Sequence, residues 1–240
     1  MGGQINLGTP WGDLIYNITQ REDVKSIVEI GTWNGQGSTM CVIKSLIDSQ
    51  VKKDFYSIEL YPDMYQLAKS FLNTYSEYVN LLEGRIIEYD DIFWFDHSII
   101  DKVNDDHARF YFDKDLFYLK NSKNVIEDLP EKIDLLILDG GEYTTYPEWS
   151  KLKDRTSIVI LDDSNILKSK RIRQEIIDSD NFITLYDNLN DRNGFSAFEK
   201  KNNNNKNMFK SPNPIQYVDP NCKPTTSKSR RISKLYFNFK

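Results

Sequence analysis

The most constraining feature of the chain is the stretch SIVEIGTWNGQGST at residues 26–39. It begins as a short apolar run rich in β-branched residues, breaks at Gly31, and passes Gly35 and Gly37 before an apolar pattern at helical spacing follows Ser38. This order predicts a strand, a glycine turn and a helix. Glycines let the backbone approach a ligand closely, and a helix N-terminus presents free N–H groups. The stretch therefore predicts a nucleotide-like ligand at the strand's carboxyl end; the alternative is a turn that serves packing alone.

The next two predicted strands also end in residues suited to a nucleoside. The second, over residues 54–59, ends in Glu59, one strand–helix–strand unit after Gly31. An acid at this tip can accept hydrogen bonds from both ribose hydroxyls of an adenosine, although a lone acid there is also typical of a solvated strand end. The third strand, over residues 79–84, ends in Gly84, and Arg85 follows it.

The later strands complete an alternation of strands and helices. Residues 133–139 are almost entirely apolar, which is typical of a central parallel strand, and residues 157–161 form the next one. Residues 182–186 and 195–198 predict a terminal pair joined across a polar loop. We therefore expect an α/β fold: a Rossmann-like, doubly wound, mostly parallel sheet of about seven strands with an antiparallel last strand.

Composition divides the chain into two parts. Residues 1–200 predict one domain, with an aromatic and acidic insertion at about residues 88–128 that ends in a helix near residues 116–129. The insertion is a candidate for substrate specificity or for a homodimer surface, and it holds both histidines, for which no catalytic role is expected. Residues 201–240 are basic and of low complexity, which predicts a disordered tail.

Charge and cysteine content narrow the class of protein further. The formal charge is −5 although the tail is basic, so the body is acidic, which argues against nucleic acid in the main cleft. The two cysteines, Cys41 and Cys222, are far apart and form neither a disulfide framework nor a zinc pattern. We expect a reducing, cytoplasmic location. No apolar run approaches the length of a membrane span.

The glycine spacing is G-x-x-x-G-x-G, which differs from the G-x-G-x-x-G of dinucleotide sites. With Glu29 ahead of the first glycine, the stretch resembles the first motif of class I S-adenosylmethionine (SAM)-dependent methyltransferases. LDGGEYTTY at residues 138–146 and ILDDSN at residues 160–165 further resemble uncharacterised methyltransferase-like proteins found beside glycan-synthesis functions, relatives of the macrocin O-methyltransferase and cephalosporin-hydroxylase-like groups. The resemblance spans residues 10–200.

The resemblance implies SAM as the cofactor. Glu29 is expected to help hold the ammonium of SAM, directly or through water, and Glu59 the ribose. The residues implied to bind the cofactor are Glu29, Gly31, Thr32, Trp33, Gly35, Gly37, Ser38, Glu59, Gly84, Arg85 and Asp139.

Three acids follow the fourth and fifth predicted strands: Asp139, Asp162 and Asp163. Because neighbouring parallel strands end at one edge of a sheet, these acids are expected to converge. Their oxygens suit Mg²⁺ or another divalent cation, as in the catechol-type O-methyltransferases that the arrangement resembles, although Asp163 stands where those have Asn. A metal would lower the pKa of a substrate hydroxyl. The alternatives are metal-free general base catalysis by Asp139 or Asp162, or acids that only hydrogen-bond neighbouring turns or SAM.

Together these features predict SAM-dependent O-methylation of a small carbohydrate-like acceptor, a sugar or nucleotide-sugar, with Asp139 and Asp162 as catalytic residues. Two alternatives stay open. One is a SAM- or nucleotide-binding module without turnover, tethered to a partner by the basic tail. The other is a metal-dependent, hydroxylase-like relative, which the lack of a two-His-one-carboxylate pattern disfavours. The glycine spacing disfavours a nicotinamide-dependent oxidoreductase.

Overall fold

The computed structural model describes residues 5–95, 106–190 and 192–201. Their strands form one seven-stranded sheet of order β3-β2-β1-β4-β5-β7-β6. The strands are β1 (Ser26–Ile30), β2 (Asp54–Glu59), β3 (Asn80–Glu83), β4 (Ile133–Leu138), β5 (Thr156–Asp162), β6 (Phe182–Asn188) and β7 (Phe195–Lys200). Pairing from β3 to β5 is parallel, whereas β7 runs antiparallel to both β5 and β6. The predicted doubly wound sheet with an antiparallel last strand is confirmed.

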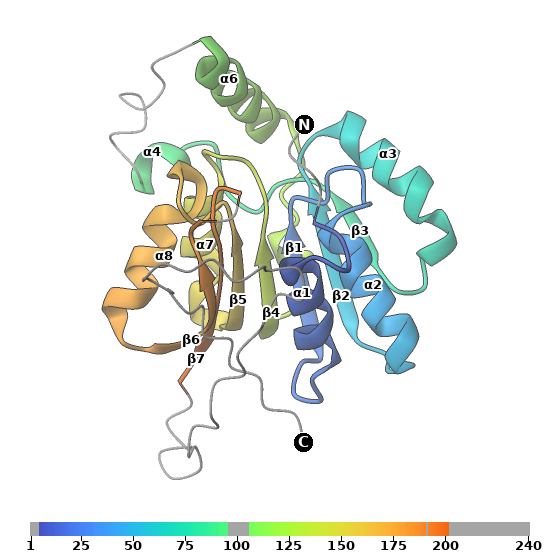
Figure 1. Ribbon diagram of the computed structural model, residues 1–240. Helices are drawn as coiled ribbons and strands as arrows, with labels where there is room; N and C mark the ends of the chain where they lie inside the picture. Colours follow the sequence, from blue (N-terminus) through green and yellow to red (C-terminus); the bar gives the residue numbers. More distant parts are fainter. Residues whose placement is uncertain (1–4, 96–105, 191, 202–240) are drawn as a thin grey trace, which may run out of the picture.

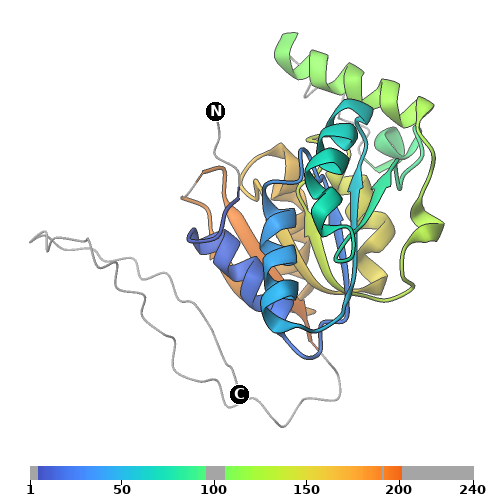
Figure 2. The same ribbon diagram turned by 90° about the vertical axis from the view of Figure 1, so that its right-hand side faces the viewer.

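Helices cover both faces of this sheet (Figure 1). One face carries α1 (Pro10–Gln20), α2 (Ser38–Ser49) and α3 (Pro62–Leu72). The other carries α4 (Asp91–Phe95), α7 (Thr145–Leu152) and α8 (Leu167–Ser179). Helix α6 (Asp106–Asn121) lies at one end of the molecule in both views (Figures 1 and 2). Short 3₁₀ turns occupy Asn73–Tyr75, Ile126–Asp128 and Lys153–Arg155.

The helix within the aromatic segment begins and ends earlier than expected. It was expected near residues 116–129, but α6 spans Asp106–Asn121. The following residues leave the helix because their backbone pairs with Arg85, whose N–H donates to Lys123 O at 2.9 Å and whose carbonyl accepts from Val125 N at 2.8 Å. A tertiary contact with the tip of β3 therefore sets the end of α6. His97 and the predicted tail from residue 202 onward, which includes Cys222, lie outside the described residues.

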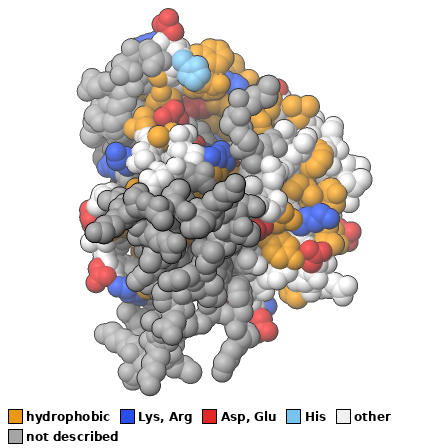
Figure 3. All heavy atoms as spheres, in the orientation of Figure 1, with side chains coloured by type: hydrophobic (Ala, Val, Ile, Leu, Met, Phe, Trp, Pro, Cys, Tyr) orange, Lys and Arg blue, Asp and Glu red, His pale blue; other side chains and the backbone are white. Residues whose placement is uncertain are grey.

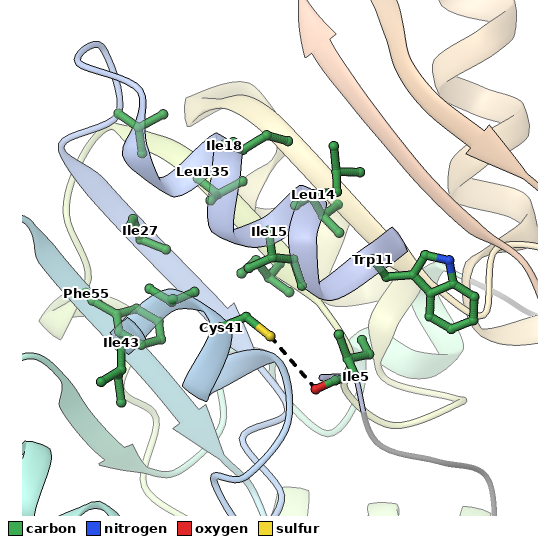
Figure 4. Packing of buried hydrophobic residues seen from close by; sticks show 14 of the residues in the cluster. Ile5, Trp11, Leu14, Ile15, Ile18, Ile27, Cys41, Ile43, Phe55 and Leu135 are labelled. Carbon is green, nitrogen blue, oxygen red and sulfur yellow. Dashed lines mark hydrogen bonds between the residues drawn. The ribbon is translucent and has the colours of Figure 1, made fainter. Parts of the chain in front are cut away.

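Two hydrophobic cores sandwich the sheet. The period-two alternation of a strand sends Leu136 and Leu138 of β4 to one core and Leu135 and Ile137 to the other. Figure 4 shows the second core, in which α1 side chains such as Ile15 pack beside β1 and β4. Within it, the thiol of Cys41 lies 3.9 Å from the carbonyl oxygen of Ile5, and burial raises the pKa of this thiol to about 12.

Along the described parts of the chain, each helix falls short of the length or the apolar character needed to span a membrane.

Candidate functional site

The carboxyl ends of the central parallel strands open into a cavity of about 450 Å³. Loops after β1, β2, β4 and β5 line it, and α6 closes one side with His107, Tyr111 and Asp115. Acidic side chains gather in the hollow near the top of the face shown in Figure 3. Both the place at the carboxyl ends of an open α/β sheet and the volume are typical of small-molecule sites.

Most of the residues predicted to bind a cofactor line this cavity. They are Gly31, Thr32, Trp33, Gly37, Ser38, Glu59, Gly84, Arg85 and Asp139. Glu29 and Gly35 do not belong to its lining. Gly35 instead lies against Leu72 of α3, where an added Cβ would come within 3.0 Å of the side chain.

The turn after β1 requires glycine at its first position. Gly31 has φ +95°, and an added Cβ would lie 2.3 Å from the carbonyl oxygen of Asp139. Its N–H donates to Ile58 O at 2.9 Å, which fixes the turn between β2 and β4. Trp33 also has a positive φ, of 53°, and its side chain remains 49% exposed. Backbone contacts therefore set the conformation of this loop, and its exposed side lines the cavity.

Glu29 is fully buried and lies on the α2 side of β1. Its carboxylate accepts hydrogen bonds from Ser38 at 2.5 Å, Thr39 at 2.7 Å and Ser57 at 2.6 Å. Burial raises its pKa, and the three hydroxyl groups lower it in part. Glu29 thus ties β1 to β2 and to the first turn of α2, and its expected part in holding the ammonium of SAM stays a prediction.

Glu59 lies at the tip of β2 and faces the cavity. Its two oxygens accept hydrogen bonds from Trp33 N at 2.7 Å and Tyr61 N at 2.9 Å. The side chain is 4% exposed, and burial raises its pKa to about 7. Beside it, Gly84 has φ +156° and donates its N–H to Glu59 O at 3.0 Å. The tips of β2 and β3 therefore form one continuous wall.

The guanidinium of Arg85 is engaged with its own loop. It lies 2.6 Å from Glu88 and donates to Ile87 O at 2.8 Å. Arg85 therefore contributes a fixed surface to the cavity.

The three acids of the predicted metal site converge, but a lysine lies among them. Lys168, near the start of α8, places Nζ 2.6 Å from Asp139, 3.4 Å from Asp163 and 3.8 Å from Asp162. Arg192, between β6 and β7, lies 3.7 Å from Asp162. We refer to Asp139, Asp162, Asp163 and Lys168 as the acid rim.

The acid rim does not fit the predicted divalent cation. In the described ranges, no group of three or more His, Cys, Asp and Glu side chains is arranged to hold a metal ion. The physical reason is that the Lys168 ammonium already lies among the three carboxylates, so a divalent cation would meet a buried positive charge at close range. The structure therefore does not support the expected Mg²⁺ at Asp139, Asp162 and Asp163.

Burial and neighbouring charges shift the pKa values of Asp162 and Lys168 in the acid rim. Burial and the nearby charge of Asp139 raise the pKa of Asp162 to about 7. Burial disfavours the charged form of Lys168, but the charges of Asp139, Asp162 and Asp163 outweigh it and hold the pKa above its ordinary value. Oδ1 of Asp162 is buried without a hydrogen-bond partner in the structure. The rim thus pairs a stable ammonium with a carboxyl group that titrates near neutrality.

A second acidic pair, Asp115 of α6 and Glu148 of α7, also lines the cavity and was not predicted. Burial raises their pKa values to about 6 and about 8, respectively. The Tyr61 hydroxyl donates to Asp115, and Oε2 of Glu148 has no hydrogen-bond partner.

Two glycines make room for this pair. A Cβ at Gly140 would lie 3.1 Å from Oε2 of Glu148, and one at Gly141 would lie 2.9 Å from Oδ2 of Asp115. The double glycine in LDGGEYTTY was the sequence signal for these neighbours. For Lys168 the sequence signal was weaker: it is a lysine shortly after the acids that end β5. Asp115 had no distinguishing signal, because it is one of many acids in its segment.

Comparisons by sequence with protein-family models and with curated proteins give no match. Solved structures do resemble the chain. The SAH-bound Podospora anserina methyltransferase PaMTH1 shares 13% identity at a TM-score of 0.53, covering 80% of this chain and 78% of that one. The O-methyltransferase from Bacillus cereus, in complex with SAH, shares 14% identity at a TM-score of 0.52 over 84% of each chain. TomG from Streptomyces achromogenes, an O-methyltransferase in complex with SAM, shares 13% identity at a TM-score of 0.51 over 82% of each chain. The chain therefore has the fold of SAM-dependent class I methyltransferases.

Proposed function

We propose that this chain is a SAM-dependent methyltransferase that methylates a hydroxyl group of a small polar acceptor. The observation that carries the proposal is one cavity lined both by the Gly31 turn with Glu59 and by the acid rim, with Gly31 lying directly against Asp139. The fold comparisons support the same assignment, because structural neighbours of this fold hold SAM or its product S-adenosylhomocysteine (SAH).

The residues of the Gly31 turn and the tips of β2 and β3 suit the nucleoside and amino acid parts of SAM. Gly31 lets the turn lie against the Asp139 backbone, where a Cβ would clash, and Gly37 is the N-cap of α2, whose first turn has N–H groups without partners inside the helix. The remaining lone pairs of Glu59 suit two ribose hydroxyls. Gly84 and Arg85 would flank the base. Bound SAM would supply a methyl group activated by its sulfonium sulfur.

The acid rim would orient the acceptor hydroxyl and accept its proton. We assign the general base role to Asp162, whose pKa of about 7 matches proton transfer near neutral pH. Asp162 would take the hydroxyl proton as the acceptor oxygen bonds to the methyl carbon and the carbon–sulfur bond breaks, which would leave SAH as the second product. Asp139, held by Lys168, would orient the hydroxyl beside Asp162.

The charge of the cavity favours a neutral sugar or an amino sugar as the acceptor over a nucleotide-sugar. The acidic lining residues are Glu59, Asp115, Asp139, Glu142, Glu148, Asp162 and Asp163, and the basic ones are Arg85, Lys168 and Arg192. Because carboxylates outnumber cations, diphosphate groups would be repelled, whereas sugar hydroxyls can donate hydrogen bonds to carboxylates.

Calorimetry with SAH and with NAD tests the cofactor. We expect SAH to bind and NAD not to bind; binding of NAD without SAH would refute the proposal. Turnover is tested by mass spectrometry after incubation with SAM and a panel of sugars and amino sugars. Asp162→Asn should retain SAH affinity and lose methyl transfer. SAH binding with no transfer to any acceptor would favour the module without turnover.

A further inference from the structure

Lys168 occupies a position that is unfavourable for a cation on two counts. Its side chain is buried, with a relative exposure of 7%, and removing an ammonium from water is costly. It also lies in the first turn of α8, where the helix dipole favours negative charge. An exposed lysine such as Lys170 on the same helix avoids the first of these costs. Only a strong local attraction can keep Lys168 in place.

That attraction comes from three carboxylates at the tips of two strands. The ammonium lies within 3.8 Å of an oxygen of each: Asp139 after β4, and Asp162 and Asp163 at the end of β5. Asp163 adopts φ 53°, a left-handed conformation that Asp tolerates better than most residues. Buried Oδ1 atoms of both Asp162 and Asp163 have no hydrogen-bond partner in the structure, so part of their acceptor capacity is unused. The three carboxylates thus surround the ammonium of Lys168.

We propose that Lys168 is a built-in counter-ion that takes the place of a divalent cation in the acid rim, and that its removal opens the rim to a divalent metal. Hard carboxylate oxygens bind Mg²⁺ and Mn²⁺ once no ammonium competes for them. The wild-type chain would then carry out its chemistry at the rim without a bound metal. Metal binding can be measured without SAM or an acceptor, so its outcome is separable from failure of the proposed methyl transfer.

The experiment is thermal unfolding with Mn²⁺ as the probe, in Lys168→Met, in the wild type and in Lys170→Met as the matched control. Wild type and Lys170→Met should show the same melting temperature in EDTA and in Mn²⁺. Lys168→Met should melt lower in EDTA, because it removes the ammonium that faces the three carboxylates and leaves Asp139 and Asp163 without it. Saturating Mn²⁺ should raise its melting temperature by about 5 °C. The double variant Lys168→Met/Asp162→Asn should lose that response.

Two results would overturn the proposal. One is a Mn²⁺-dependent rise in the wild type that Asp162→Asn abolishes, since the rim would then bind metal despite Lys168. The other is a folded Lys168→Met variant that does not respond to Mn²⁺. If this variant does not fold in EDTA, refolding it with Mn²⁺ provides the same test: recovery only with metal supports the proposal, and no recovery overturns it.

Discussion

At the residue scale, Gly31 allows the backbone of the first turn to be tested directly. Gly31 and Gly8 both have a positive φ, +95° and +85°, but a Cβ at Gly31 would lie 2.3 Å from Asp139 O, whereas one at Gly8 meets nothing within 4 Å. We expect Gly8→Ala to cost about 1 kcal/mol of unfolding free energy through conformational strain. Gly31→Ala should cost at least about 2 kcal/mol more, and it should abolish SAH binding.

Urea unfolding and calorimetry with SAH would measure both effects. Gly8→Ala serves as the control for the positive φ alone, because Gly8 is exposed and distant from any clash. Equal losses in the two variants would show that the approach of Gly31 to Asp139 has no consequence.

Glu59 is the residue whose proposed role depends most on its charge. In Glu59→Gln, a neutral amide of the same shape replaces the carboxylate. It would lose acceptor capacity toward the ribose and toward the N–H groups of Trp33 and Tyr61. Because a hydrogen bond to a charged group contributes about 1.5–3 kcal/mol, we expect SAH affinity to fall by about tenfold or more. Glu83→Gln, an exposed acid that pairs with Glu59 across the two strands, is the control. Unchanged SAH affinity in Glu59→Gln would remove Glu59 from the cofactor site.

At the element scale, the sequence allowed the sheet and its tips to be predicted because both depend on local pattern. The apolar run of β4 indicated a central strand, and acids after β4 and β5 had to meet because parallel strands end at one edge. The hydrogen-bond partners of the acid inside β1 could not be predicted in the same way. Glu29 was expected to help hold the ammonium of SAM, directly or through water, and this stays a prediction; in the structure, hydroxyl groups of α2 and β2 donate to its carboxylate.

The partners of the acid rim could not be read from local pattern. The place of Lys168 depends on the turn after β5, in which Asp163 takes a positive φ, and on the angle at which α8 leaves the sheet. Asp115 reaches the cavity only because α6 begins earlier than its pattern indicated and packs beside Tyr61. Both positions are tertiary consequences, and sequence periodicity carries no information about them.

Side-chain hydrogen bonds connect helix α6 to its surroundings: the Tyr61 hydroxyl donates to Asp115, and the Tyr143 hydroxyl donates to Ala108 O at 3.3 Å. Tyr61→Phe keeps the ring and removes the first of these bonds. We expect amides of α6 to exchange with solvent about fivefold faster, which corresponds to a loss of about 1 kcal/mol of local stability. Hydrogen exchange measured by mass spectrometry would report it, with Tyr65→Phe, one turn along α3, as the control. Unchanged exchange in α6 would mean that other contacts hold the helix in place.

The outer face of α6 is the candidate surface for assembly into a homodimer. Phe110 and Phe117 are 62% and 59% exposed, and the homodimer expected from the aromatic segment stays a prediction. Light scattering of the full chain would determine the oligomeric state.

At the scale of the whole molecule, the buried acids of the cavity make stability depend on pH. The pKa values of Glu59 and Asp162 are raised to about 7, that of Asp115 to about 6 and that of Glu148 to about 8. Each is raised above the value in the unfolded chain, so the folded state binds more protons between pH 5 and pH 8. The free energy of unfolding must therefore fall as the pH rises through this window.

Glu148 is the sharpest test of this dependence, because its shift is the largest of the four and burial is its main cause. One pKa unit corresponds to about 1.4 kcal/mol, so we expect the ligand-free protein to lose a few kcal/mol between pH 5 and pH 8. Glu148→Gln cannot ionise, so urea unfolding should show a clearly shallower decline, whereas exposed Glu131→Gln should match the wild type. A wild-type protein equally stable at pH 5 and pH 8 would show that these carboxyl groups do not share the buried, weakly solvated cavity from which the proposed chemistry is argued.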